Sequence, residues 1–352
     1  MKRFFTVSLT LFALAVLWAP LAEAQITDIT IREINAIPAD SIDALNAAAE
    51  ALNDPRIENA IFNDLVGDTV RVGAIVMSDP TLSGLSSPDG SGLPSRVHFF
   101  VRDTAAVSLG VEGMGIQVVD GSWQENGVLG LLIGDVVELV GTVSPFDEVM
   151  QIAPVSITVI GTVGSFDFPA SAMDPVVITT ADVHRVVTGG IQANWSNLAD
   201  LRGQYVRFEN ALVQRRDISS DRPNWTFSTD GGATQLYIRD ISLAYRNDRD
   251  GAYDDSQFRV FFDDFTPPPP GSGINLQGFL AFDDFDPFGI GAPDDGLIAI
   301  GPMEREDLEV TVTPPIVTNV TRPTTVVGAE TVSVSADVTA DPARALASVN
   351  LN

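Results

Sequence analysis

Between residues 62 and 310, short runs of the chain alternate between apolar and polar positions. The clearest run is RVHFFVR at residues 96–102, where positions 97, 99 and 101 are apolar. A period of two, bounded by Gly, Pro, Asp and Ser, is the pattern of half-buried β-strands. The runs carry no long helical period, so the pattern predicts an all-β fold.

The strand pattern occurs twice along the chain. Four motifs of the first half recur in the same order in the second half, at a nearly constant spacing. They are Gly67–Val72 with Gly203–Phe208, Phe99–Asp103 with Leu236–Asp240, Val137–Gly141 with Ile274–Gly278, and Ile160–Gly161 with Ile300–Gly301. Self-similarity at a fixed spacing indicates an internal duplication.

Each copy contains five strand patterns within about 100 residues, a size that suits one small domain. Five strands of this kind suit an OB-like barrel, in which a glycine inside a strand marks a sharp bend. Gly141 and Gly278 occupy such positions. The sequence therefore predicts two tandem OB-like five-stranded barrels, at residues 62–163 and 201–310, with a β-sandwich as the alternative.

Other segments flank the two copies. Residues 25–61 form an N-terminal lead with a helix from Asp40 or Ser41 to about Asn53, and residues 164–200 form a linker. Beyond residue 311, three strand patterns predict the start of an immunoglobulin-like β-sandwich, which normally needs about seven strands. They are Ile316–Val320, Thr331–Val338 and Ala347–Leu351. We therefore expect a truncated domain at 311–352, followed by downstream domains in a longer chain.

The first 24 residues have the pattern of a signal peptide. Lys2 and Arg3 precede the apolar stretch Phe4–Trp18, and small residues at Ala22 and Ala24 suit a signal peptidase. A membrane anchor is the alternative, but no charge cluster that would stop transfer follows. We expect a protein that is secreted or held at the cell surface, without integral membrane contact after cleavage.

Composition excludes several kinds of active site. The chain has no Cys, Lys occurs only at position 2, and His98 and His184 are the only imidazoles. Thiolate zinc sites, P-loops and pyridoxal Schiff bases each need one of the missing residues.

The formal charge of −27 disfavours binding to phosphate backbones, although a salty habitat or a GC-rich genome explains the charge equally well. Paired carboxylates permit glycosidase chemistry, but among 47 acidic residues pairs have little diagnostic weight.

Four segments of the first copy and two of the second resemble a known family. Leu65–Val72, Phe99–Asp103, Gly115–Gly121 and Gly134–Val143 in the first copy, and Leu201–Asn210 and Met303–Leu308 in the second, carry the similarity. They resemble the OB-like tandem repeats of secreted Bacteroidota-type proteins, which often end in a type IX secretion sorting domain or accompany extracellular nucleases. The resemblance covers roughly residues 60–310 and implies an OB fold and a surface location.

The polar side of the repeated strand is the candidate ligand-binding face. If positions 97, 99 and 101 point into the barrel, the side chains between them share the outer face. An aromatic ring beside a cation can stack a base or sugar and hold a phosphate or carboxylate. The candidates are Arg96, His98, Phe100 and Arg102 in the first copy and Tyr237 and Arg239 in the second. A solvated sheet face with Arg–Asp pairs is the alternative.

An acidic segment offers a candidate calcium site. Four carboxylates surround Gly251 in the sequence NDRDGAYDD at residues 247–255. Oxygen-rich loops of this kind bind Ca²⁺, although Arg246 and Gln257 occupy positions that exclude an EF-hand. The candidate metal ligands are Asp248, Asp250, Asp254 and Asp255. Ordinary Asp-Gly turn chemistry is the alternative.

Together these observations predict a binding or spacer module without catalytic activity. Its ligand can be a polysaccharide, a nucleic acid or a protein. The alternative is the accessory N-terminal region of a secreted nuclease or other hydrolase whose catalytic domain lies outside this chain.

Overall fold

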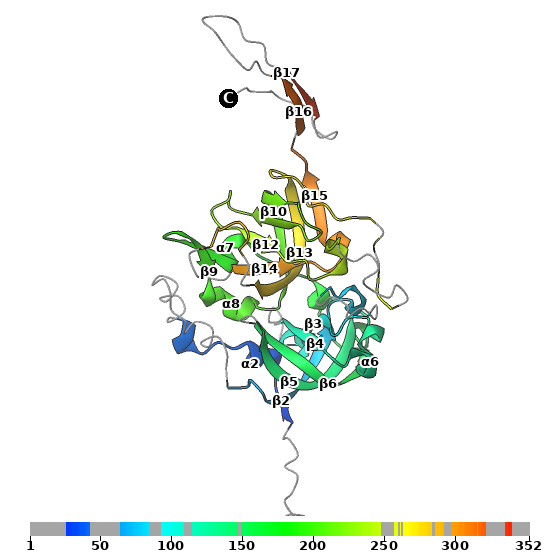
Figure 1. The fold of residues 1–352 in the computed structure, drawn as a ribbon. Helices are drawn as coiled ribbons and strands as arrows, with labels where there is room; N and C mark the ends of the chain where they lie inside the picture. The colour runs from blue at the N-terminus through cyan, green and yellow to red at the C-terminus, as the bar shows by residue number, and fades with distance from the viewer. Residues whose placement is uncertain are drawn as a thin grey trace, which may run out of the picture.

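The computed structural model confirms a mostly β fold built on two closed five-stranded barrels (Figure 1). It describes residues 26–42, 64–84, 93–108, 115–146, 149–247, 257–259, 261, 263–283, 286–291, 297–314, 316–321 and 335–339. No helix in these ranges is long and apolar enough to cross a membrane.

The first barrel closes through five strands. They pair in the order β2–β3–β4–β6–β5, and β5 returns to β2. This is the order of a five-stranded OB-type Greek-key barrel. The strands are β2 (Thr69–Val76), β3 (Val97–Asp103), β4 (Gly115–Asp120), β5 (Asp135–Phe146) and β6 (Val149–Thr162). Alternate residues of each strand fill the interior, including Val70, Phe99, Ile116, Leu139 and Ile152.

The second barrel repeats the strand order. Its strands pair as β10–β11–β12–β14–β13, and β13 returns to β10. A further strand, β15, extends the edge of β13. The strands are β10 (Tyr205–Asp217), β11 (Asn224–Ser228), β12 (Leu236–Ile238), β13 (Gly273–Asp283), β14 (Leu297–Gly301) and β15 (Leu308–Val312).

Strand register confirms part of the sequence repeat. Val70 pairs with Gly141 in the first barrel, and Val206 pairs with Gly278 in the second. These are the residues that the first and third motifs equate. Both barrels therefore close through the same pair of strands in the same register.

The second motif equates strands that are not equivalent, and the fourth equates different positions of two equivalent strands. Phe99–Asp103 lies in β3, whereas Leu236–Asp240 begins in β12, whose place in the barrel order is that of β4. Ile300 lies in β14, opposite Leu280 of β13. Ile160 lies near the C-terminal end of β6, in the half of that strand that follows its pairing with β4. The reason is that any half-buried strand carries the same alternation, so similarity between two strands does not establish their position. The prediction that Arg102 and Arg239 occupy the same strand is wrong.

The segment predicted as a linker, 164–200, contains the start of the second repeat. Strand β1 (Thr27–Asp28) pairs in parallel with β2, and β7 (Val176–Val177) pairs in parallel with β10. After each strand a threonine caps a short helix, α2 (Ile31–Asn35) or α7 (Thr180–Val183). Thr30 and Thr179 each form a capping box with the acidic residue three positions later. The duplicated unit therefore includes its lead strand and helix.

Short elements complete the barrels. Strands β8 (His184–Val187) and β9 (Gly190–Ala193) form a hairpin. The remaining described helices are α5 (Thr104–Ser108), α6 (Trp123–Asn126), α8 (Trp195–Leu201), η1 (Pro80–Leu82), η2 (Val128–Gly130), η3 (Val163–Ser165), η4 (Ala170–Met173), η5 (Leu243–Tyr245) and η6 (Arg305–Asp307). Residues 39–42 are helical, and the rest of the helix predicted to about Asn53 lies outside the described residues.

Beyond the second barrel, β16 (Ile316–Thr321) and β17 (Ser335–Thr339) form an antiparallel pair. They fall in the first two segments predicted for the immunoglobulin-like domain. The third segment, Ala347–Leu351, lies outside the described residues. The complete sandwich stays a prediction.

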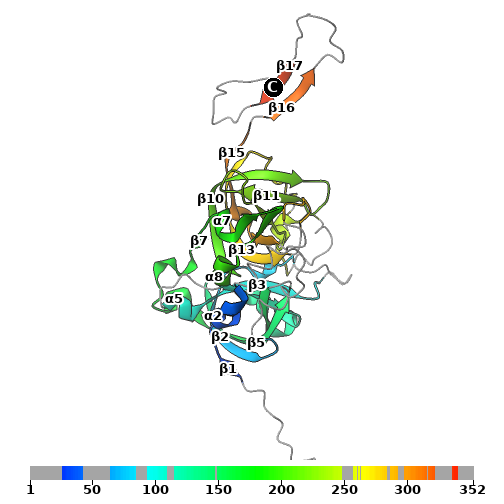
Figure 2. The same cartoon turned by 90° about the vertical axis from the view of Figure 1, so that its left-hand side faces the viewer.

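The two barrels pack directly against each other (Figure 2). One apolar cluster joins Ile75 and Phe100 of the first barrel to Ile241, Phe279 and Met303 of the second. At the contact two backbones cross at glycines. A Cβ atom added to Gly115 would lie 2.0 Å from the Gly203 carbonyl oxygen, and one added to Gly203 would lie 2.4 Å from the Gly115 carbonyl oxygen.

We expect Gly115→Ala to lower the free energy of unfolding by about 1–3 kcal/mol, because the new methyl group meets backbone that cannot rotate away. Urea denaturation measures the change. Gly121→Ala is the matched control, since a Cβ there has no heavy atom within 4 Å. Equal losses in the two variants would contradict the close crossing.

Candidate ligand-binding surface

The predicted ligand face of β3 is covered by the second barrel. Phe100 stacks on Phe279 with ring centroids 4.1 Å apart and an interplanar angle of 8°. Tyr205 stacks on the same Phe279 ring at 4.9 Å. Phe100 is 1% exposed, so its ring is part of the contact between barrels and offers no open platform for a ligand. The alternation correctly placed it outside the first barrel but could not show what lies over it.

His98 is buried beside this contact. Its Nδ1 lies 3.0 Å from the Ser83 hydroxyl, which also accepts a hydrogen bond from the His98 backbone N–H. Burial, with a smaller contribution from Arg96, lowers the pKa of His98 to about 3. The imidazole is therefore neutral, and its Nε2 has no hydrogen-bond partner among the described residues.

Arg102 connects β3 to the segment between the barrels. Its guanidinium donates to the Ala172 carbonyl at 2.7 Å and to the Asp174 carbonyl at 2.9 Å. Arg102 is 4% exposed. Its charge therefore satisfies the last carbonyls of η4 and is not presented on an open face.

Tyr237 and Arg239 do not continue the β3 face. Tyr237 is buried, donates its hydroxyl proton to Asp286 and accepts a hydrogen bond from the Phe288 N–H at 2.9 Å. Burial, followed by this bond to Asp286, raises the pKa of Tyr237. Arg239 is half-buried, and its backbone N–H bonds to Ile300. The Tyr237 side chain therefore holds the loop at Asp286–Phe288 over β12, and the six candidates are divided between β3 and β12 in different barrels.

Arg96 lies at a more open position. Its guanidinium carbon lies 5.7 Å from the centre of the Phe146 ring, and Phe146 is 40% exposed. On β4 and β6, Gln117 and Gln151 lie side by side and buried, joined by an amide hydrogen bond of 2.6 Å. Sequence analysis missed Phe146 and both glutamines. The sequence could have indicated the two glutamines, because each is a polar residue within an otherwise apolar strand.

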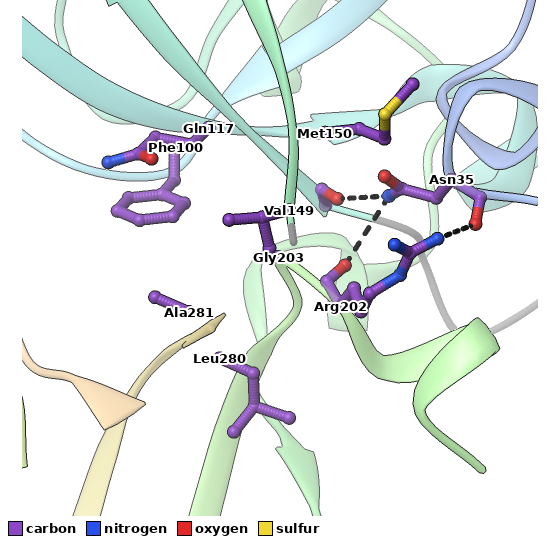
Figure 3. Close-up of a pocket in the computed structure, with 10 residues that line it drawn as sticks. Asn35, Phe100, Gln117, Val149, Met150, Arg202, Gly203, Leu280 and Ala281 are labelled. Carbon is purple, nitrogen blue, oxygen red and sulfur yellow. Dashed lines mark hydrogen bonds between the residues drawn. The ribbon is translucent and has the colours of Figure 1, made fainter. Parts of the chain in front are cut away.

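A small hollow lies where the barrels meet (Figure 3). Asn35 donates to the Gly115 carbonyl at 2.8 Å, and Arg202 donates to the Asn35 carbonyl. The hollow holds about 250 Å³ of empty space with its open mouth included. Most of this space is open to solvent, and the enclosed part has room for about one water molecule. The hollow is therefore a packing gap between the barrels.

The other buried titratable groups hold loops and strands in place. His184 Nδ1 donates to the Gln235 carbonyl at 2.7 Å, and its Nε2 accepts from the Ile298 N–H at 3.0 Å. Burial lowers the pKa of His184 to about 4 against a smaller opposing effect of the Gln235 bond. Burial raises the pKa of Asp307, whose carboxylate accepts bonds from the backbone N–H groups of Met303 and Glu304.

The predicted calcium ligands Asp248, Asp250, Asp254 and Asp255 lie outside the described residues. Within the described ranges, no group of three or more His, Cys, Asp or Glu side chains could hold a metal ion.

No protein-family model matches the chain, and no curated protein is similar to it in sequence. Among solved structures, a murine DNA-binding protein bound to double-stranded DNA aligns at 10% identity and a TM-score of 0.31, over 68% of this chain and 96% of that one. The single-stranded DNA-binding protein from Thermus aquaticus aligns at 11% identity and a TM-score of 0.19, over 71% and 96% of the two chains. The OB assignment rests on the strand order and register described above.

We expect Phe100 and Phe279 to be energetically coupled. In a double-mutant cycle of Phe100→Leu and Phe279→Leu, stacking should give an interaction energy of about 0.5–1.5 kcal/mol. Thermal and urea unfolding provide the four stabilities. Phe208 lies in the core of the second barrel against Phe227, so Phe208→Leu should add independently to Phe100→Leu. Simple additivity in both cycles would disprove the contact between barrels.

Acid should destabilise the protein through its two histidines. Their pKa values are about 3 and 4 when folded, below the ordinary value of 6.5, so below pH 6.5 the unfolded chain gains protons that the folded chain does not. Each histidine should lower the free energy of unfolding by about 1.4 kcal/mol per pH unit between pH 6 and 5. In urea titrations, the free energy of unfolding of His98→Gln and of His184→Gln should each fall less steeply between pH 6 and 5 than that of the unsubstituted chain, by the contribution of the one histidine removed. An unchanged slope in both variants would mean that neither imidazole is buried as described.

Proposed function

We propose that this chain is an exported, non-catalytic binding module whose two OB barrels act as one rigid unit. The observation that carries the proposal is the stacking of Phe279 on Phe100, which fixes one barrel on the outer face of the other. A rigid pair of barrels presents loops and strand edges at constant spacing, which is what a binding or spacer module requires.

The hydrogen bonds of the buried titratable groups support a role without catalysis. His184, Tyr237 and Asp307 have shifted pKa values, and each is hydrogen-bonded within the fold: His184 to backbone groups, Tyr237 to Asp286 and the Phe288 N–H, and Asp307 to backbone N–H groups, the Tyr205 hydroxyl and the Gln277 amide. A general acid or base needs a proton that can reach a substrate. In these groups the proton or lone pair is already engaged within the fold.

The net charge of the chain narrows the class of ligand. A net charge of −27 repels a polyphosphate backbone and attracts basic surfaces. Among polysaccharide, nucleic acid and protein, this favours an uncharged or basic ligand over nucleic acid. Calcium stays a proposal for the acidic segment 247–255, where four aspartates surround Gly251.

Export and a surface location rest on the sequence. Residues 1–24 have the three-part pattern of a signal peptide. The resemblance to secreted Bacteroidota-type OB-like repeats agrees with that pattern, and a type IX sorting domain in a longer chain would complete it.

The purified chain 25–352 should retain a ligand on arrays that present glycans, oligonucleotides and proteins, each with and without Ca²⁺. We expect retention of protein or glycan, and weaker retention of oligonucleotides at low salt because the chain repels phosphate. Heat-unfolded chain is the control. Retention no greater than that control on all three arrays would refute a binding function and leave only a spacer.

A further inference from the structure

The far half of β6 is a sheet edge without charge. Residues 153–162 run along β5 on one side, where Ser156–Val159 pair in continuous register and Val155 and Ile160 are β-bulges without a partner in β5. On the other side, β4 pairs with β6 only at Gln151 and Ile152, so within the described residues no strand continues along 153–162. The segment reads APVSITVIGT and contains no ionisable side chain. Unpaired backbone N–H and C=O groups on a β-branched edge form a template for another strand.

Apolar side chains gather around this edge. Val155 is 62% exposed, Val159 49% and Ile160 54%. The Val163 N–H bonds to the Gly134 carbonyl, which brings the turn with exposed Leu132 and Ile133 to the end of β6. Among the described residues, half of the large exposed hydrophobic side chains lie within residues 132–166. A contiguous apolar patch beside an open edge marks an interaction site.

The second barrel shows how the same edge looks when it is protected. By register, β15 occupies the place of this half of β6: Glu309 opposite Asn275 corresponds to Thr158 opposite Glu138. Glu309 pairs with Arg207 at 3.5 Å and accepts a bond from Asn275 at 2.8 Å. A charged side chain on an edge strand discourages strand addition. The first barrel carries threonine at that position.

We propose that the edge 153–162 of β6 binds an extended segment of a basic partner protein, which adds to the sheet as a strand. This inference rests on the proposed binding function and names its partner class. Backbone hydrogen bonds to the regular stretch Ser156–Val159 would supply affinity, and apolar side chains of the segment would contact exposed Val159 and the bulged Val155 and Ile160 on either side. The charge of −27 favours a partner with positive flanks and opposes a second copy of this chain.

The test uses a labelled peptide of alternating Val and Thr with two Arg at each end. Its binding to the chain 25–352 is measured by fluorescence anisotropy. Val159→Lys should weaken binding at least tenfold, because the new ammonium lies on the edge and repels the Arg flanks. Val310→Lys is the matched control in β15, where Val310 is 47% exposed and takes the place of Val159. It should leave the affinity unchanged.

Two further peptides separate the causes of binding. Asp flanks in place of Arg should reduce affinity at least tenfold, and N-methylation of alternate amides should abolish binding by removing backbone donors. Equal weakening by Val159→Lys and Val310→Lys, or no binding of the Arg-flanked peptide, overturns the edge proposal. A dimer in sedimentation that Val159→Lys dissolves also overturns it, since a second copy would then occupy the edge.

The array experiment distinguishes this failure from failure of the proposed function. A ligand retained equally by the unsubstituted chain and by Val159→Lys refutes the edge and leaves the binding module intact. Absence of both array retention and peptide binding refutes the binding function itself.

Discussion

The close crossing of two backbones at Gly115 and Gly203 determines what the rest of the molecule can present. Because neither position has a side chain, the end of α8 reaches the start of β4 at backbone distance. That approach brings Phe279 onto Phe100 and the Arg202 guanidinium onto the Asn35 carbonyl. A pair of barrels joined by a flexible linker would expose the outer face of β3. Here the same face becomes the core of the contact.

Duplication has given two barrels with one framework and different surfaces. Strand pairing, lead strand and capping box are the same in both units. The outer face of β3 is covered by the other barrel, whereas the outer face of β12 is covered by its own loop through Tyr237 and Asp286. The interior of a barrel must be filled in both copies, but each outer surface has been free to change.

Sequence patterns predicted what depends on local periodicity and missed what depends on long-range contact. Alternation in 96–102 correctly placed His98, Phe100 and Arg102 outside the barrel, and the Val70–Gly141 and Val206–Gly278 correspondence held. Burial of that face could not be predicted, because it depends on long-range contacts: Phe279 covers Phe100 from 179 residues away, and the carbonyls that bind Arg102 lie about 70 residues away. The lead strand β7 was missed because a two-residue strand has no measurable period.

Charge and edge protection act together in this chain. A strongly acidic surface keeps copies apart, so an open strand edge is less hazardous here than in a neutral protein. Glu309 adds local protection to β15 in the second barrel. The overall negative charge therefore repels other copies of this chain, and the stretch 153–162 can lack charged residues without promoting self-association. The long-range repulsion is screened within about 8–10 Å at physiological salt, whereas strand pairing acts at contact distance. A basic segment that approaches within the screening length reaches a strand edge that carries no charge. Because repulsion acts at longer range than strand pairing, the same surface can repel a second acidic copy of this chain and still bind a basic partner.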